Sequence, residues 1–91
     1  MNQKAMMKYL MEYLGTLLFV FVILKMPNPL VIGLTLAVLI FVAGSTSGGH
    51  FNPAVSMTMW VRKSLKTNDA VLYVLMQLLG GYTAFKLSKM L

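Results

Sequence analysis

The chain of 91 residues contains no cysteine, only two acidic residues and a single histidine. The absence of cysteine excludes disulfide bonds and thiolate metal sites. The sequence also has no paired nucleophile and base, no cluster of metal ligands and no phosphate-binding glycine motif. We therefore expect that the protein is not an enzyme and that it holds no metal and no cofactor.

Charged residues of either sign are scarce, and apolar residues are abundant. Hydrophobic residues make up 58% of the chain and charged residues 11%. The apolar residues fall in blocks rather than in amphipathic stripes, which is typical of an all-α integral membrane protein. The eight basic residues are scattered at segment ends, where they would lie near anionic lipid headgroups. A clustered basic face is missing, so we expect no nucleic-acid partner.

Three apolar segments are long enough to be considered membrane spans, at about residues 9–26, 30–44 and 70–86. Residues 1–8 are interpreted as a short polar leader, and Pro27 and Pro29 mark the turn between the first two spans. N-cap candidates for the third span are Thr67, Asn68 and Asp69. The fold predicted from these segments has three transmembrane helices.

Small residues four positions apart mark two helix faces where another helix can approach closely. One such pair is Gly33 and Ala37 in the second span, and the other is Gly80 and Ala84 in the third. Thr35 is expected to bond to its own helix backbone.

Residues 47–56, with the sequence Ser-Gly-Gly-His-Phe-Asn-Pro-Ala-Val-Ser, form the most informative stretch, called the signature segment below. Gly48 and Gly49 permit a tight loop. Asn52 is a favoured N-cap and Pro53 suits the first helical position, so a helix is predicted to begin at Pro53.

This helix is short. It extends to about Val61 before a basic cluster, so its length is roughly 15 Å, about half of a hydrocarbon core. A glycine loop followed by such a helix predicts a re-entrant loop and half-helix over residues 45–62. Irregular backbone at that depth is tolerated where it is buried in protein or lines a wet cavity.

The motif Gly-His-x-Asn-Pro-Ala-Val-Ser resembles the first signature loop of the aquaporin and aquaglyceroporin family, the major intrinsic proteins. Residues 12–16 resemble the Glu-x-x-Gly-Thr of that family's first helix, and residues 77–80 resemble the Gln-x-x-Gly of its third. The resemblance covers the first half of the family only. It implies that residues 1–91 form a single half-aquaporin domain.

The resemblance also implies site residues. Pore and signature-loop residues would be His50, Asn52, Pro53 and Ala54, with the Asn52 amide donating to a passing oxygen. Positions matching the family's selectivity filter are Ile32, Ile40, Gly49 and Val55. Because Val55 stands at the place of the filter arginine, the constriction is expected to be apolar and permissive.

Two polar residues in the spans leave alternatives open. Glu12 either pairs with Lys8, one turn earlier on the same face, or accepts hydrogen bonds from backbone N–H groups of the signature segment, as the resemblance implies. Gln77 is expected to form a structural bond, either to another helix or to the loop. His50 is likewise expected to brace the loop.

The function implied is a passive membrane channel for water and small neutral solutes such as glycerol. The family's pore has two inverted halves, and this chain matches one, so the expected partner is a second copy in an antiparallel homodimer, or a higher oligomer, within membrane lipid. Flanking basic residues are nearly balanced between the two sides, five against three. The alternative is a non-conducting membrane subunit or remnant that associates with a full-length channel.

Overall fold

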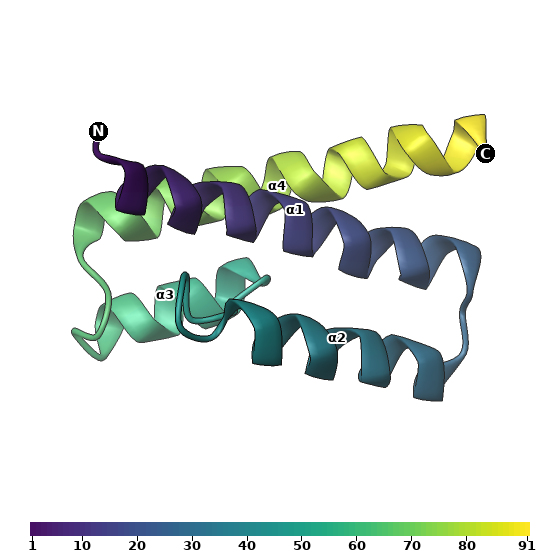
Figure 1. Cartoon of the computed structure of the whole chain (residues 1–91), viewed down its shortest axis with the longest axis horizontal. Coiled ribbons are helices and arrows are strands. Elements are labelled where there is room, and N and C mark those ends of the chain that lie inside the picture. The colour runs from purple at the N-terminus through teal and green to yellow at the C-terminus, as the bar shows by residue number, and fades with distance from the viewer.

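The computed structural model describes residues 1–91, which form four helices and no strand (Figure 1). Their bounds are α1 Gln3–Lys25, α2 Pro29–Ala43, α3 Pro53–Val61 and α4 Thr67–Met90. The all-α prediction is therefore confirmed. The helix predicted to begin at Pro53, with Asn52 as its N-cap, is also confirmed.

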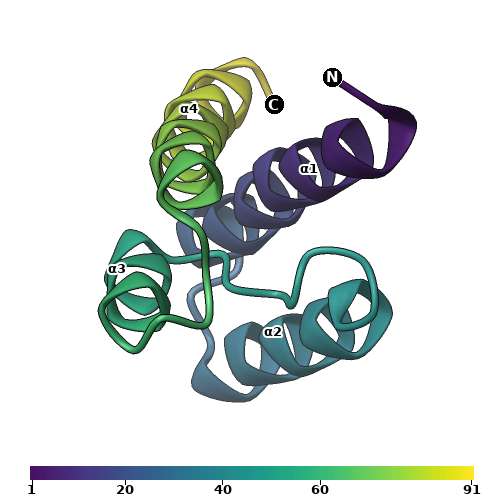
Figure 2. The same cartoon turned by 90° about the vertical axis from the view of Figure 1, so that its left-hand side faces the viewer.

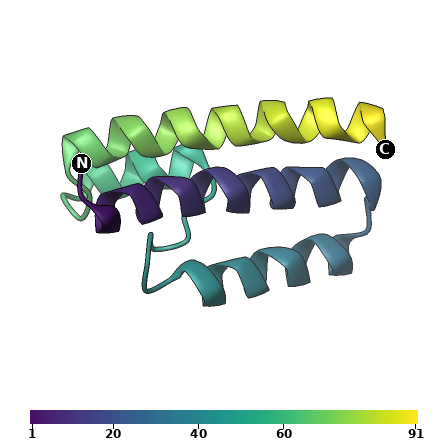
Figure 3. The same ribbon diagram turned by 45° about the horizontal axis from the view of Figure 1, so that its top comes forward.

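The helices α1 and α4, from opposite ends of the sequence, lie side by side along their lengths (Figures 1 and 3). Gly80 permits this contact, because a Cβ atom added there would lie 2.5 Å from the Tyr13 carbonyl oxygen and 3.2 Å from the Leu17 nitrogen. Ala84, one turn later, is fully buried. The predicted close approach at Gly80 and Ala84 is therefore confirmed.

The other two helices each pack on one neighbour. The helix α2 contacts no helix except α1, and α3 contacts no helix except α4 (Figure 2). A Cβ atom added to Gly33 would meet nothing within 4 Å, and Ala37 is exposed, so this pair faces no other helix of the chain. Ala43 is the only buried residue of α2.

The ends of α1 and α4 differ from the sequence-based expectation. The first helix begins earlier than expected and includes most of residues 1–8, because the Asn2 Oδ1 atom accepts a hydrogen bond from the Ala5 N–H at 2.8 Å and α1 begins at Gln3. The predicted side-chain cap of α4 is also wrong. Its N-cap is Lys66, without a side-chain hydrogen bond. The Asp69 carboxylate, which would have been a capping candidate, instead binds side chains of α1.

Two helices, α1 and α4, are long and apolar enough to cross a membrane, with 23 and 24 residues. The third apolar helix, α2, has 15 residues, which gives a length of about 22 Å. Only 14 of the 91 residues are buried, and many large apolar side chains, such as Phe41 and Leu34, lie on the outside. Such an exterior suits lipid or further protein rather than water. Thr35 donates to the Val31 carbonyl oxygen at 2.7 Å, as expected.

Candidate functional site

The signature segment turns back toward the middle of the molecule after α2 ends (Figure 1). Gly48 and Gly49 have φ angles of 91° and 64°, which glycine adopts at little cost. Phe51 has a φ of 53°, an uncommon conformation for a residue with a side chain. The loop therefore needs strong contacts to hold it in this shape.

Glu12 supplies most of those contacts. Its side chain is fully buried. The Oε2 atom accepts hydrogen bonds from the Ser47 hydroxyl at 2.7 Å and the His50 N–H at 3.1 Å. The Oε1 atom accepts from the Phe51 N–H at 2.7 Å and the Gln77 Nε2 at 2.9 Å. One carboxylate thus joins α1 and α4 to the loop, and it satisfies two backbone N–H groups that no helix or strand could satisfy.

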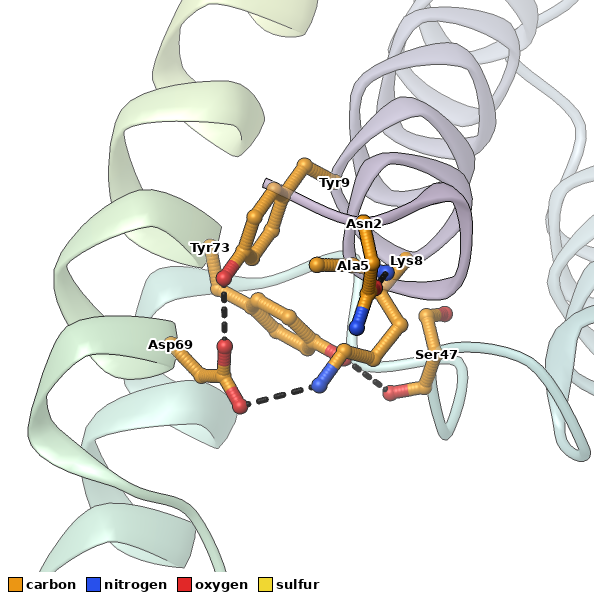
Figure 4. A network of polar contacts seen from close by, with 7 residues as sticks. All are labelled: Asn2, Ala5, Lys8, Tyr9, Ser47, Asp69 and Tyr73. Carbon is orange, nitrogen blue, oxygen red and sulfur yellow. Dashed lines mark hydrogen bonds and ion pairs between the residues drawn. The ribbon is translucent and has the colours of Figure 1, made fainter.

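Lys8 is not the partner of Glu12. Its Nζ atom lies 3.0 Å from the Asp69 Oδ2 atom, and the Tyr9 hydroxyl donates to Asp69 Oδ1 at 2.6 Å (Figure 4). The geometry therefore agrees with the alternative in which Glu12 accepts hydrogen bonds from backbone N–H groups of the signature segment. It does not agree with an ion pair between Glu12 and Lys8. Sequence reasoning missed this role of Asp69, whose position in the first turn of α4 suggested only a cap.

Ser56, on α3, was also missed as a functional residue. It is fully buried, and its hydroxyl lies 2.8 Å from the Gln77 Nε2 and 2.9 Å from the His50 Nδ1. Gln77 thus donates to Glu12 on α1 and to Ser56 on α3, so both of its hydrogen bonds join helices and neither goes to the loop itself. A small polar residue within a mostly apolar half-helix was the available signal.

Tyr73 of α4 also holds the loop. It is nearly fully buried, and its hydroxyl donates to the Ser47 carbonyl oxygen at 2.7 Å (Figure 4). Its ring meets the His50 ring at a centroid distance of 5.1 Å and the Tyr9 ring at 6.1 Å, both edge to face. Nothing in the sequence distinguished this tyrosine from the other three.

Phe51 is fixed by its ring as well as by its backbone. The ring is 2% exposed, and a Cβ atom added to Gly15 would overlap it. The glycine of the Glu-x-x-Gly-Thr motif therefore provides the space into which the loop inserts its aromatic side chain.

Asn52 lies at the N-terminus of α3, with Pro53 and Ala54 following. Its Oδ1 atom accepts from the Ala54 N–H at 2.8 Å, its amide group makes no hydrogen bond within the chain, and its side chain is exposed. Pro53 is half-buried and Ala54 is exposed. The Asn52 amide is therefore available to a hydrogen-bond acceptor from outside the chain.

The four filter-like positions do not all come together. A Cβ atom added to Gly49 would lie 3.1 Å from the Ile40 Cα atom, so these two residues are in contact. Val55 is half-buried on α3. Ile32, however, is two turns from Ile40 along α2, a separation of about 12 Å. One chain alone cannot place Ile32 and Ile40 at a single constriction.

Comparisons with known proteins identify relatives of this chain. The family model described as major intrinsic protein matches residues 26–91. Glycerol uptake facilitator protein-like 6 of Lactiplantibacillus plantarum is 39% identical over 88 aligned positions, covering 87% of this chain and 41% of that protein. Aquaporin-8 of Mus musculus is 40% identical over 91 aligned positions, covering 88% of this chain and 35% of that protein. No solved structure gives a significant match.

A further relative, aquaporin Z of Photorhabdus laumondii, is 38% identical over 55 residues, which cover 60% of this chain and 24% of that protein. The chain thus spans less than half the length of the curated relatives that it matches. The family model covers most of the chain, including the signature segment and its supports on α4. On these grounds the chain belongs to the major intrinsic protein family and is an integral membrane protein.

Proposed function

We propose that this chain forms a passive channel for water and small neutral solutes such as glycerol. In the arrangement proposed, α1, α2 and α4 span the bilayer, and the signature segment with α3 re-enters it as a loop and half-helix. Two copies in opposite orientations enclose the pore. The names of the relatives, an aquaporin and a glycerol uptake facilitator, support the solute class.

The observation that carries this proposal is that the side-chain amide of Asn52 has a free N–H₂ group. Its carbonyl oxygen caps α3, and its amide group is exposed and unpaired beside the N-terminus of that helix. The first turn of a helix carries unsatisfied N–H groups and a positive partial charge. Together these donors would orient the oxygen of water or an alcohol and disfavour a cation, with no covalent step.

A second copy is proposed because one chain leaves this site uncovered. No contact joins α2 to α3, and Asn52 and Ala54 at the start of α3 are exposed. Polar groups left against hydrocarbon cost several kcal/mol each. A second copy, related by a two-fold axis in the membrane plane, would cover this face and supply the second half-helix.

The filter-like positions give a second reason. Ile32 and Ile40 are too far apart to meet within one chain. Antiparallel copies of α2 would bring the Ile32 end of one copy to the depth of the Ile40 end of the other. Each constriction would then combine Ile32 of one copy with Ile40, Gly49 and Val55 of its partner, without an arginine. We expect such a pore to admit neutral solutes and to exclude cations through desolvation cost and the helix dipoles.

The test is osmotic shrinkage of liposomes that contain the purified chain, followed by stopped-flow light scattering under an impermeant gradient and then a glycerol gradient. The variant Asn52→Leu removes the free amide. We expect it to lower permeability about tenfold, the factor given by losing about 1.4 kcal/mol of hydrogen bonding at the narrowest point. It also removes the cap of α3, so helix content is checked by circular dichroism.

The matched control is Asn68→Leu, the same substitution at an exposed asparagine of α4. It should leave shrinkage unchanged. Water flow at the rate of protein-free liposomes, from chains shown to be folded, would contradict the channel. So would equal permeability of a folded Asn52→Leu variant.

A non-conducting subunit that associates with a full-length channel is the second candidate, since the relatives matched are more than twice as long as the aligned region. Oligomer mass and orientation separate the two. The proposed channel requires even numbers of copies, and crosslinking must find both orientations in one membrane. A stable complex with a longer partner, and no conduction without it, would establish the second candidate.

A further inference from the structure

The seam between α1 and α2 carries a feature that the pore does not use. At one end of the seam is a cavity of 540 Å³ between the first two turns of α1 and the residues that follow α2. It is lined by Gln3, Lys4, Met7, Lys8, Ser45 and Thr46. We call it the polar pocket.

The polar groups that line this pocket are hydrogen-bond donors and include no acid. Two are lysine ammonium groups, two are hydroxyls and one is an amide. Lys8 is held by Asp69 at 3.0 Å, whereas Lys4 forms no ion pair. The N-terminus of α1 adds its positive partial charge at the same place. Such a donor set fits an anion.

Further along the same seam lies a second cavity, of 410 Å³, which is apolar. Its lining residues are Leu18, Val31, Leu34, Thr35, Val38 and Leu39. The one hydroxyl among them, that of Thr35, is already bonded to the Val31 carbonyl oxygen. We call this cavity the apolar groove.

The two cavities lie along one face of α1. Steps of three or four residues lead along this face from Lys4 through Met7 to Leu18. Residues of α2 complete the apolar groove, and Ser45 and Thr46, which follow that helix, complete the polar pocket. The distance from Lys4 to Leu18 along α1 is about 21 Å, somewhat more than the ~15 Å of one hydrocarbon leaflet. In the membrane arrangement proposed above, the polar end of the seam would lie at the depth of headgroups and its apolar part at the depth of acyl chains.

We propose that this seam binds one anionic phospholipid, with its phosphate in the polar pocket and an acyl chain in the apolar groove. Charge complementarity selects this occupant, because the pocket offers cationic donors and the groove offers none. Ser45 and Thr46 directly precede Ser47, whose hydroxyl binds Glu12 and whose carbonyl oxygen accepts from Tyr73. A lipid bound here would thus stabilise the start of the signature segment.

Native mass spectrometry of the purified full chain tests this proposal without any need for conduction. The probes are phosphatidylglycerol and phosphatidylcholine with identical acyl chains. We expect about fivefold stronger retention of phosphatidylglycerol, the factor for about one additional lysine contact. Lys4→Gln should abolish this preference. Lys86→Gln, which removes an exposed lysine at the other end of the molecule, should leave it unchanged.

A second variant tests the groove separately. Val38→Trp fills it and should lower the retention of both lipids to a similar degree, while the preference for the anionic lipid persists. Val38 is 59% exposed, so the larger ring can be accommodated without disturbing the core. Inorganic phosphate at millimolar concentration should not displace the lipid.

Three results would overturn the proposal. An unchanged preference in Lys4→Gln would show that the polar pocket does not bind the headgroup. Displacement of the lipid by inorganic phosphate would reduce the site to a free-anion pocket. Loss of oligomers, rather than of lipid, in Val38→Trp would show that another copy of the chain covers the seam. None of these results depends on whether the chain conducts water, so failure here is distinguishable from failure of the channel.

Discussion

At the scale of single residues, the fold depends most on Glu12. A fully buried carboxylate is costly in a membrane protein unless its oxygens are satisfied, and here four donors surround it. Two of these donors are backbone N–H groups of the loop, which have no other partner in a helix or strand. The carboxylate and the loop therefore stabilise each other.

Replacing the Glu12 carboxylate tests directly how far the stability of the fold depends on it. In Glu12→Gln, an amide N–H₂ group would face donors that need an acceptor. Each buried donor left unpaired costs about 1 to 3 kcal/mol, so we expect a loss of about 3 kcal/mol in unfolding free energy and a fall in melting temperature on the order of 10 °C. Loss of the helical circular dichroism signal on heating in detergent micelles measures it.

The other acidic residue provides the matched control. Asp69→Asn makes the same chemical change, but the side chains of Lys8 and Asp69 are 32% and 15% exposed. Partly exposed ion pairs contribute about 0 to 1 kcal/mol. Equal melting temperatures of the two variants would refute the central role of Glu12.

At the scale of elements, the pairing of α1 with α4 organises the chain. Both α2 and α3 are attached to this pair, one to each helix (Figure 2). Side chains of both members, Glu12 on α1 and Tyr73 on α4, form hydrogen bonds to the signature segment. The close approach of the two backbones at Gly80 sets the distance between Glu12 and Gln77. Small changes at this contact should therefore affect the whole site.

Two adjacent glycines of α4 allow a sharp test. A Cβ atom at Gly80 would collide with the Tyr13 carbonyl oxygen at 2.5 Å, whereas at Gly81 the nearest atom would be 3.9 Å away on Val20. Gly80→Ala should lower the unfolding free energy by about 1 to 3 kcal/mol through overpacking. Gly81→Ala should raise it by about 0.5 to 1 kcal/mol, because alanine loses less entropy in a helix.

Urea or thermal unfolding in micelles measures both variants against the parent chain. Destabilisation of the same size by both substitutions would mean that the helix backbone, and not the contact with α1, determines the outcome.

The elements could be predicted from the sequence to different degrees. The order of the helices, and the start of α3 at Pro53, follow from apolar blocks and local capping chemistry. The start of α1 was missed because one side chain, that of Asn2, extends the helix into a polar stretch. At α4 the expected cap failed because the Asp69 carboxylate finds stronger partners across the interface with α1. Tertiary contacts with α1, and not local capping, therefore determine the structure at the N-terminus of α4.

The residues of the site also differ in how far the sequence predicts their roles. The connection of Glu12 to the loop followed from a family motif, and no pattern in the chain itself would have supplied it. Ser56 and Tyr73 escaped notice because their roles depend on two helices meeting at one point of the loop. The positive φ of Phe51 was equally hidden, since phenylalanine has no preference for that conformation.

At the scale of the whole molecule, the lack of cysteine has a practical result. Mercurial reagents react with thiolates, and this chain has none. Water flow through the proposed channel should therefore be unchanged by mercuric chloride in the liposome assay. Ala54→Cys, which places a thiol at an exposed position beside Asn52, should make the flow sensitive.

Inhibition of the cysteine-free chain would mean that a contaminating channel carries the water. Persistent flow in the fully modified Ala54→Cys protein would mean that the pore does not pass Asn52. Both readings use the same preparation as the osmotic assay.

The contacts of Glu12 also bear on how the chain enters a membrane. Its partners follow it by 35 to 65 positions, and the last, Gln77, belongs to the final helix. While a ribosome is still producing α2 and α3, the first helix carries a carboxylate that hydrocarbon does not tolerate alone. We expect α1 to remain in contact with the protein-conducting channel, and not to move fully into lipid, until α4 has been synthesised. Orientation would then be decided only after α4 is made, by the basic residues that flank all of these helices together. In the proposed antiparallel pair, this late decision would let copies of the chain insert in both directions.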